Sequence, residues 1–212
     1  MSQSRANILN SIREVISTTE RINNFKSCSN NDLSDVYIKT NDSLELVFAQ
    51  EFTKINGKFV FCENISEFNE NIQLLIKEYA LDSVYCIDSN IQKLLENAGI
   101  PYLSSEEDFL GLNVAVTSCE SLIARTGSVL VSSRQASGRK LNVYPNIHIV
   151  ISLSKNLVYD IKDAMDKLQT ECTNLPSQIT LITGPSRTAD IEKTLVLGAH
   201  GPKELYVFLI KF

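Results

Sequence analysis

The chain has 212 residues and a mass of 23.7 kDa, which at roughly 150 residues per domain is long for one domain and short for two. A hydrophobic content of 43% and a charged content of 21% are typical of a globular protein with a substantial core. These values exclude disordered, collagen-like and low-complexity chains. The formal net charge of −5 argues against a general nucleic-acid binder.

Five cysteines are spread along the chain, and no two of them have the close spacing of a local metal site. Their separations are 34, 24, 33 and 53 residues, counted through Cys28, Cys62, Cys86, Cys119 and Cys172. A C-x₂₋₄-C pair is what aims two thiolates at one ion. An odd cysteine count without a signal peptide indicates reduced thiols. Because no run of about 18 apolar residues is present either, we expect a cytoplasmic protein without a membrane span.

The first 31 residues are expected to precede the main domain. Residues 4–17 place apolar side chains at helical spacing, and a polar stretch over residues 18–31 follows. The sequence therefore predicts an N-terminal amphipathic helix with a polar connector over residues 1–31, and one α/β domain over residues 32–212.

From residue 32 onward, short apolar runs alternate with longer segments of 3.6-residue period. Strands are predicted over residues 36–39, 58–62, 84–87, 114–117, 128–132, 148–153, 178–183 and 205–210, and helices over 43–55, 65–79, 89–98, 157–169 and 188–197. Several of the strands are apolar at consecutive positions, which is typical of burial on both faces of a parallel sheet. The alternation predicts an α/β fold, a three-layer arrangement with helices on both faces of a mainly parallel sheet.

The two halves of the chain differ in charge. Residues 1–110 carry 9 Lys and Arg against 17 Asp and Glu, and residues 111–212 carry 11 against 8, so that −8 and +3 sum to −5. Between Glu120 and Asp160 there is no carboxylate, whereas five cations lie there: Arg125, Arg134, Arg139, Lys140 and Lys155. This stretch predicts either a basic, partner-facing surface or a pocket for a carboxylate or phosphate. Since it contains few aromatic residues, a small anion fits it better than nucleic acid.

The first segment that could carry chemistry spans residues 117–133. A strand ending at Thr117 is predicted to lead into a short helix, which the turn Thr126-Gly127-Ser128 then breaks. Glycine tolerates a positive φ that turns backbone N–H groups outward, and the flanking hydroxyls add donors for an anion. An ordinary glycine C-cap with solvated hydroxyls is the alternative.

The second segment joins two predicted strands over residues 132–148. Arg139 offers a planar fork of donors that suits a carboxylate or phosphate. His148 stands at the entry of an apolar strand, so it is either a ligand-binding residue or a structural histidine. The chain has two histidines, and their spacing does not predict a zinc site.

The third segment, residues 179–202, carries the strongest pattern. A buried strand ends before Gly184, a helix is predicted from Thr188, and Gly198 is expected to close that helix. Ligands of α/β sheets bind at the carboxyl ends of strands, and free N–H groups at a helix start bind anions. The candidate anion-binding residues are therefore Gly184, Ser186, Arg187, Thr188, Asp190, Glu192, His200 and Gly201. Helix capping is an alternative explanation for three of them, Thr188, Asp190 and Glu192.

Four stretches resemble the LUD-domain family, and most closely its lactate-utilization protein C branch. They are IARTGSVLVSS (123–133), HIVISL (148–153), TGPSRTADIEKTLVLGAHGP (183–202) and ELYVFLI (204–210). The resemblance covers residues 111–212 densely and the first half through predicted topology alone. It implies a NagB/RpiA/CoA-transferase-like fold and a part in oxidising L-lactate to pyruvate alongside two companion proteins. Many relatives carry an acidic residue before the Thr-Gly turn, where this chain has Arg125.

Oxidation of a 2-hydroxy acid releases two electrons, which a nicotinamide, flavin, metal or cluster must accept. The sequence has neither a dinucleotide fingerprint nor clustered cysteines for iron–sulfur ligation. We therefore expect no cofactor in this chain, and iron–sulfur clusters only in a partner protein of the LUD type.

The function expected from these observations is a component of lactate oxidation that binds a small carboxylate or other anion. Two alternatives stay open. One is a stand-alone transferase or ligase acting on an anionic substrate of the acyl-CoA or folate type, since one fold hosts many activities. The other is a non-catalytic scaffold of the complex. The sequence assigns neither a catalytic residue nor an oligomeric state.

Overall fold

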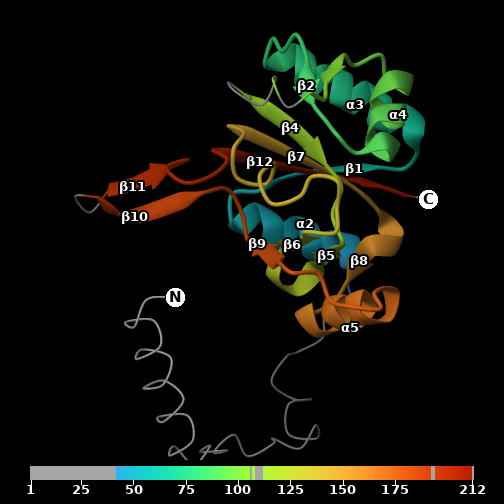
Figure 1. Cartoon of the computed structure of the whole chain (residues 1–212), viewed down its shortest axis with the longest axis vertical. Coiled ribbons are helices and arrows are strands. Elements are labelled where there is room, and N and C mark those ends of the chain that lie inside the picture. Colours follow the sequence, from blue (N-terminus) through green and yellow to red (C-terminus); the bar gives the residue numbers. More distant parts are fainter. Residues whose placement is uncertain (1–41, 106, 108–111, 192–193, 212) are drawn as a thin grey trace, which may run out of the picture. The chain divides into compact units, whose positions relative to one another are not determined.

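Six parallel strands form the central sheet of the computed structural model, which describes residues 42–105, 107, 112–191 and 194–211 (Figure 1). In spatial order they are β1 (Lys58–Cys62), β12 (Glu204–Ile210), β7 (Ile147–Leu153), β4 (Val114–Thr117), β2 (Val84–Tyr85) and β3 (Tyr102–Leu103). Every neighbouring pair is parallel. This confirms the predicted parallel sheet, while the strand predicted at residues 36–39 and the N-terminal helix lie outside the described residues.

Both faces of this sheet are buried, as its apolar strands predict. Along β12, the side chains of Leu205, Val207 and Leu209 pack in one core cluster, and those of the residues between them pack in another. The second cluster lies under helices α3 (Ile65–Glu78) and α4 (Ser89–Asn97). The first lies under helix α2 (Leu44–Lys54) and a smaller sheet.

The boundaries of α2, α3 and α4 match the prediction to within about two residues because local capping sets them. Ser43, Asn64 and Asp88 each accept a hydrogen bond from a backbone N–H of the first turn. Helix α5 (Ile161–Glu171) begins four residues later than expected. Asp160 caps it, with Asp163 completing a capping box, and Leu157–Val158 before it forms strand β8.

The smaller sheet consists of β8 (Leu157–Val158), β5 (Ser121–Ile123), β6 (Ser128–Ser132) and β9 (Ile179–Ile182) in that order. Together with α2 it covers the face opposite α3 and α4 (Figure 1). The α/β class and the layering are thus confirmed, with one covering layer built partly of strands. The short helix predicted after Thr117 is wrong. Leu122 and Ile123 pack in two different clusters, so both faces of β5 are buried, and only the 3₁₀ turn η2 (Ala124–Thr126) follows it.

The helix predicted over residues 188–197 is also wrong. Strands β10 (Arg187–Ile191) and β11 (Thr194–Leu197) form an antiparallel hairpin there, with Thr188 opposite Val196. The segment is rich in β-branched residues, which favour strands over helices. Gly198 follows β11 at φ 74°, so it closes a strand and not a helix. The hairpin extends away from the central sheet (Figure 1).

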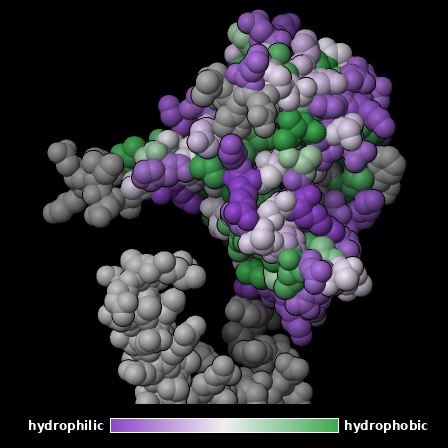
Figure 2. Space-filling view, viewed as in Figure 1, coloured by the Kyte–Doolittle hydropathy of each residue, from purple (hydrophilic) through white to green (hydrophobic). Residues whose placement is uncertain are grey.

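Hydrophobic residues reach the face seen in Figure 2 in small patches separated by hydrophilic ones. Among the large apolar side chains that are exposed are Leu74 in α3 and Leu197 in β11. In the part of the chain that the structure describes, no helix has the length and apolar character needed to cross a membrane.

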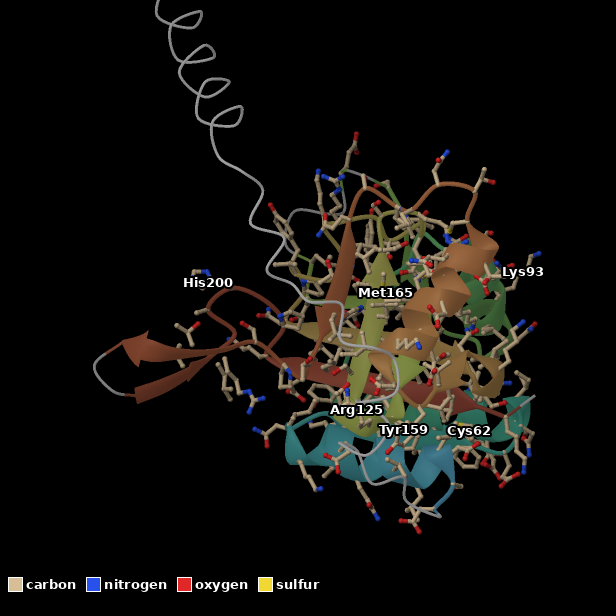
Figure 3. All side chains as sticks on the ribbon, turned by 90° about the horizontal axis from the view of Figure 1, so that it is seen from below. Cys62, Lys93, Arg125, Tyr159, Met165 and His200 are labelled. Atoms are coloured by element: carbon tan, nitrogen blue, oxygen red, sulfur yellow. The ribbon has the colours of Figure 1, made fainter. Side chains whose placement is uncertain are left out.

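Arg125 has a structural contact that the sequence did not predict. Its Nε and Nη2 donate hydrogen bonds of 2.9 and 2.8 Å to the two carboxylate oxygens of Asp160, which joins η2 to the start of α5. Figure 3 shows Arg125 close to Tyr159, whose carbonyl accepts the Arg125 backbone N–H. The guanidinium holds the pKa of Asp160 below its usual value. Arg125, which stands where many relatives carry an acidic residue, is therefore a cation paired with the Asp160 carboxylate.

We predict that Arg125→Ala lowers the free energy of unfolding by about 1–2 kcal/mol, because both partners of the pair are only about a quarter exposed. The measurement is urea denaturation at pH 7, with Lys155→Ala as a control that removes an exposed cation. Since the pKa of Asp160 is lowered by folding, the pair stabilises the fold above the unfolded pKa of about 3.9 and loses this effect as the pH falls below it. Equal losses in both variants would contradict the assignment.

Candidate functional site

Two glycine turns contact the C-terminal end of α2. Gly127 has φ 57°, and a Cβ on it would lie 2.4 Å from the backbone N of Phe52. Gly184 has φ 84°, and a Cβ there would lie 2.5 Å from the backbone O of Ile55. Both positions combine a left-handed conformation with a close backbone approach, so only glycine fits them. Two segments far apart in sequence are thereby placed against one helix end.

Polar contacts join these turns to the base of the hairpin. The hydroxyls of Ser128 and Thr183 share a hydrogen bond of 3.0 Å. The backbone N–H of Ser186 donates to the carbonyl of Pro202 at 2.8 Å, and the backbone N–H of Gly198 donates to the carbonyl of Ser186 at 3.0 Å. We name the resulting group, residues 126–128, 183–187 and 200–202, the motif cluster.

The motif cluster presents several unused hydrogen-bond donors. The Arg187 side chain is exposed and has no hydrogen bond or ion pair with any described residue. His200 is exposed too, and its side chain points away from the ribbon in Figure 3. The hydroxyl of Thr126 is buried and has no partner within the described residues. The exposed guanidinium and imidazole are the groups here that are suited to binding a carboxylate or phosphate, whereas the Thr126 hydroxyl lies too deep to reach one.

The motif cluster lies at the amino ends of the parallel strands, whereas the sequence predicted a site at their carboxyl ends. Pro202 lies two residues before the start of β12, and the backbone N–H of Lys203 donates to the carbonyl of Asn146, just before β7. The prediction is wrong because β9 belongs to the smaller sheet and pairs antiparallel to β6. The proposed role of a helix N-terminus fails as well, because a strand follows Ser186.

The remaining candidates of this segment fall on the hairpin. Thr188 is part of the β10–β11 ladder. Asp190 lies in β10, but its side chain is outside what the structure describes, and so is Glu192. Because Asp190 lies in a strand, no helix dipole is available to favour its carboxylate.

His148 lies deep in the core, at the amino end of β7. It is fully buried in β7, where its Nε2 is 2.8 Å from the Thr117 hydroxyl and its Nδ1 has no partner within the described residues. Burial lowers the pKa of His148 to about 4, so the ring is neutral at physiological pH. This placement favours the structural alternative for this histidine.

Arg139 also stands apart from the motif cluster. It lies in the loop of residues 133–146, which leaves β6 at the opposite end from Ser128, about 13 Å away at 3.3 Å per residue. Its Nη2 donates to the Ser177 hydroxyl at 2.7 Å. The structure therefore places the predicted anion-binding residues in more than one location.

The start of this loop is held by an ionic network that the sequence did not predict. Arg134 Nη2 donates to Glu120 at 2.6 Å and to Glu171 at 2.9 Å, and the Ser132 hydroxyl also donates to Glu120. Burial alone would raise the pKa of Glu120, but the hydrogen bonds from Arg134 and Ser132 outweigh it and lower the pKa. The two acids lie far from Arg134 in sequence, so no local spacing could have indicated this network.

Three of the four cysteines in the described region are poorly placed for chemistry, whereas Cys172 is partly exposed. Cys62, Cys86 and Cys119 are buried and free, and burial raises the pKa of the Cys86 and Cys119 thiols to about 12. They are therefore protonated at neutral pH, and a protonated thiol is a weak nucleophile and metal ligand. Within the described residues no group of three or more His, Cys, Asp or Glu is arranged to hold a metal ion.

The glycine contact gives a direct prediction. Gly127→Ala should lower the free energy of unfolding by at least about 2 kcal/mol more than Gly99→Ala, because both have a positive φ but only Gly127 has backbone within 3 Å of the new Cβ. Urea denaturation measures both variants, and Gly99→Ala should show the conformational cost alone. Similar losses would mean that α2 does not contact the turn as described.

The buried His148 gives a second prediction, on pH. Its pKa falls from about 6.5 when unfolded to about 4 when folded, so the unfolded state takes up the proton first as the pH drops. The free energy of unfolding should then decrease by up to about 3 kcal/mol between pH 6.5 and pH 4 through this residue. His148→Asn should lack that part of the pH dependence. NMR titration of the His148 ring provides a direct readout, and a midpoint near 6.5 would contradict the placement.

The chain is similar to known proteins over most of this fold. The family model of the LUD domain matches residues 46–210. Lactate utilization protein C of Bacillus subtilis is 36% identical over 101 residues, which are 46% of this chain and 42% of that protein. The same-named protein of Macrococcus caseolyticus is 35% identical over 99 residues, 45% and 43% of the two chains. An uncharacterized protein of Neisseria meningitidis is 30% identical over 123 residues, which are 58% of this chain and 52% of that protein. The matches thus span about half the length of these relatives, or less.

A solved structure shows the same fold. The crystal structure of a DUF162 family protein from Deinococcus radiodurans superposes with a TM-score of 0.59 at 15% identity, and the match covers 79% of this chain and 96% of that one. At this identity the likeness establishes the fold alone.

Proposed function

The chain belongs to the LUD-domain family, and from this membership we propose that it is a component of a lactate-utilization system that binds a small carboxylate at the motif cluster. The observation that carries the proposal is the similarity to proteins named lactate utilization protein C. Lactate and pyruvate each carry one carboxylate, which is the group that the donors of the motif cluster are suited to bind.

Arg187 is the principal binding residue in this proposal. Its guanidinium is exposed and unpaired among the described residues, and it stands at the fixed base of the hairpin next to Ser186. Arginine binds a carboxylate through two parallel hydrogen bonds, which fixes the orientation of the acid. His200 is exposed as well and lies two residues before Pro202, whose carbonyl accepts from Ser186, so it supplies a further donor near the base of the hairpin.

The electrons of lactate oxidation go, in this proposal, to iron–sulfur clusters of a partner protein of the LUD type. Support comes from the chain's own cysteines, which are widely spaced in sequence, and three of which are buried. Such cysteines do not form the closely spaced sets that hold iron–sulfur clusters. This chain would then bind or present the acid while its partner accepts the electrons.

We predict that Arg187→Ala weakens binding of L-lactate or pyruvate about tenfold or more, because hydrogen bonds to a charged group contribute about 1.5–3 kcal/mol. Titration calorimetry or NMR shift perturbation measures the affinity. Lys155→Ala is the matched control, since it removes one exposed cation elsewhere, and Arg187→Lys separates charge from the planar fork. Unchanged affinity with a lowered melting temperature would make Arg187 a structural residue.

The cellular test uses the same variants. Deletion of the gene should abolish growth on L-lactate, and the wild-type gene but not Arg187→Ala should restore it. The tagged wild-type chain should co-purify with an iron–sulfur protein. Normal growth of the deletion strain on L-lactate would refute the proposed role.

A further inference from the structure

Four titratable side chains form a hydrogen-bonded network at the amino ends of β1 and β12. Lys58 is the first residue of β1 and Glu204 the first of β12, and the two strands are neighbours in the central sheet. The Lys58 Nζ donates a hydrogen bond of 2.5 Å to the Glu204 carboxylate. It also donates to the hydroxyls of Tyr79 at 3.0 Å and Tyr206 at 2.8 Å. An ammonium has three N–H groups, so all of them are used within the protein.

The partners of Lys58 also contact one another and enclose its ammonium. The Tyr79 hydroxyl donates to the Glu204 carboxylate and lies 2.8 Å from the Tyr206 hydroxyl. The Lys58 Nζ lies 4.8 Å from the centre of the Tyr206 ring, close enough for a cation to be attracted to the aromatic face. Burial alone would raise the pKa of Glu204, but the hydrogen bonds from Lys58 and Tyr79 outweigh it and lower the pKa. Lys58 is therefore held in one place although its side chain is 49% exposed.

On one side the network supports the turn on which the Arg187 guanidinium lies. Lys58 comes three residues after Ile55, in the short connection from α2 to β1. A Cβ on Gly184 would lie 2.5 Å from the carbonyl oxygen of Ile55 and 3.4 Å from the Nη2 of Arg187. The guanidinium thus lies directly over the Gly184 turn, and that turn lies directly on Ile55.

On the other side the network supports the residue before Arg187. Glu204 comes two residues after Pro202, whose carbonyl accepts the backbone N–H of Ser186 at 2.8 Å. Ser186 immediately precedes Arg187 at the base of the hairpin. Displacement of the Glu204 end of β12 would therefore move the support of Ser186.

These contacts form a closed ring around the proposed carboxylate site. It runs through Lys58, Ile55, Gly184, Arg187, Ser186, Pro202 and Glu204. The hydrogen bond between Lys58 and Glu204 closes this ring, so its loss loosens both supports of the guanidinium together. A binding group must be held to within about 0.5 Å by the residues around it to be effective.

We propose that Lys58 is a positioning residue of the carboxylate site, which through Glu204 fixes the place from which Arg187 presents its guanidinium. The inference rests on the proposed binding of a carboxylate by Arg187. It gives a role in that site to a lysine from the acidic first half of the chain.

The opposite ends of the same two strands provide a matched control. Lys211 directly follows β12, and its Nζ donates at 3.1 Å to Glu63, which directly follows β1. This ion pair also joins β1 to β12, and its side chains are 59% and 55% exposed. It lies at the carboxyl ends of the strands, whereas the motif cluster lies at the amino ends.

The first measurement is titration calorimetry of the full chain with L-lactate. Lys58→Met keeps most of the side-chain length but removes the charge and the donors, so it should weaken binding about fivefold or more. Glu204→Gln, which keeps the shape of the side chain, should weaken binding in the same direction. Lys211→Met should change the affinity less than about twofold. Arg187 keeps its own donors in all three variants, so a weakened affinity reports its placement.

The second measurement is NMR of the chain without lactate. The Arg187 Nε–H resonance and the backbone amide resonance of Gly184 should shift in Lys58→Met and stay in place in Lys211→Met. Unchanged resonances with a lowered melting temperature would overturn the proposal, because Lys58 would then be structural only. So would shifted resonances with an unchanged affinity, or equal effects in Lys211→Met. If the wild-type chain does not bind L-lactate, the proposed function fails, and the two resonances alone decide whether Lys58 places Arg187.

Discussion

A backbone contact at the C-terminal end of α2 is the constraint on which the polar surface of this protein depends. Gly127 and Gly184 approach Phe52 and Ile55 so closely that no side chain could stand between them. The turn Thr126-Gly127 before β6 and the turn Thr183-Gly184 after β9 are therefore held together, although they lie far apart in the sequence. The hydroxyl pair of Ser128 and Thr183, and the hairpin base beyond it, are positioned by the same contact.

The motif cluster lies at the amino end of β12, where the parallel strands of the central sheet begin. Its cations come from the second half of the chain, which carries a net charge of +3, whereas the acidic first half supplies α2. An overall negative charge thus coexists with a locally basic site, because charge acts over about a Debye length and not over the whole molecule.

Local signals predicted the helices of the first half of the fold, and they failed after Thr117 and over residues 188–197. Ser43, Asn64 and Asp88 cap helices where the sequence placed them, since a cap needs only neighbours along the chain. A helix was predicted in place of the hairpin because acidic residues after a turn are typical of a helix start. The pairing of Thr188 with Val196 across the hairpin leaves no mark in the spacing of apolar residues along the sequence. Arg139, a candidate for binding an anion, stands apart from the motif cluster, because the loop that carries it leaves β6 at the opposite end from Ser128.

The ionic network of Arg134 joins two parts of the molecule that are far apart in the sequence. One guanidinium holds both Glu120, at the entry of the smaller sheet, and Glu171, at the end of α5, and it stands at the start of the loop of residues 133–146. Because one side chain holds both acids, the start of the loop and the last turn of α5 should loosen together when that side chain is removed, and amide hydrogen exchange would report both.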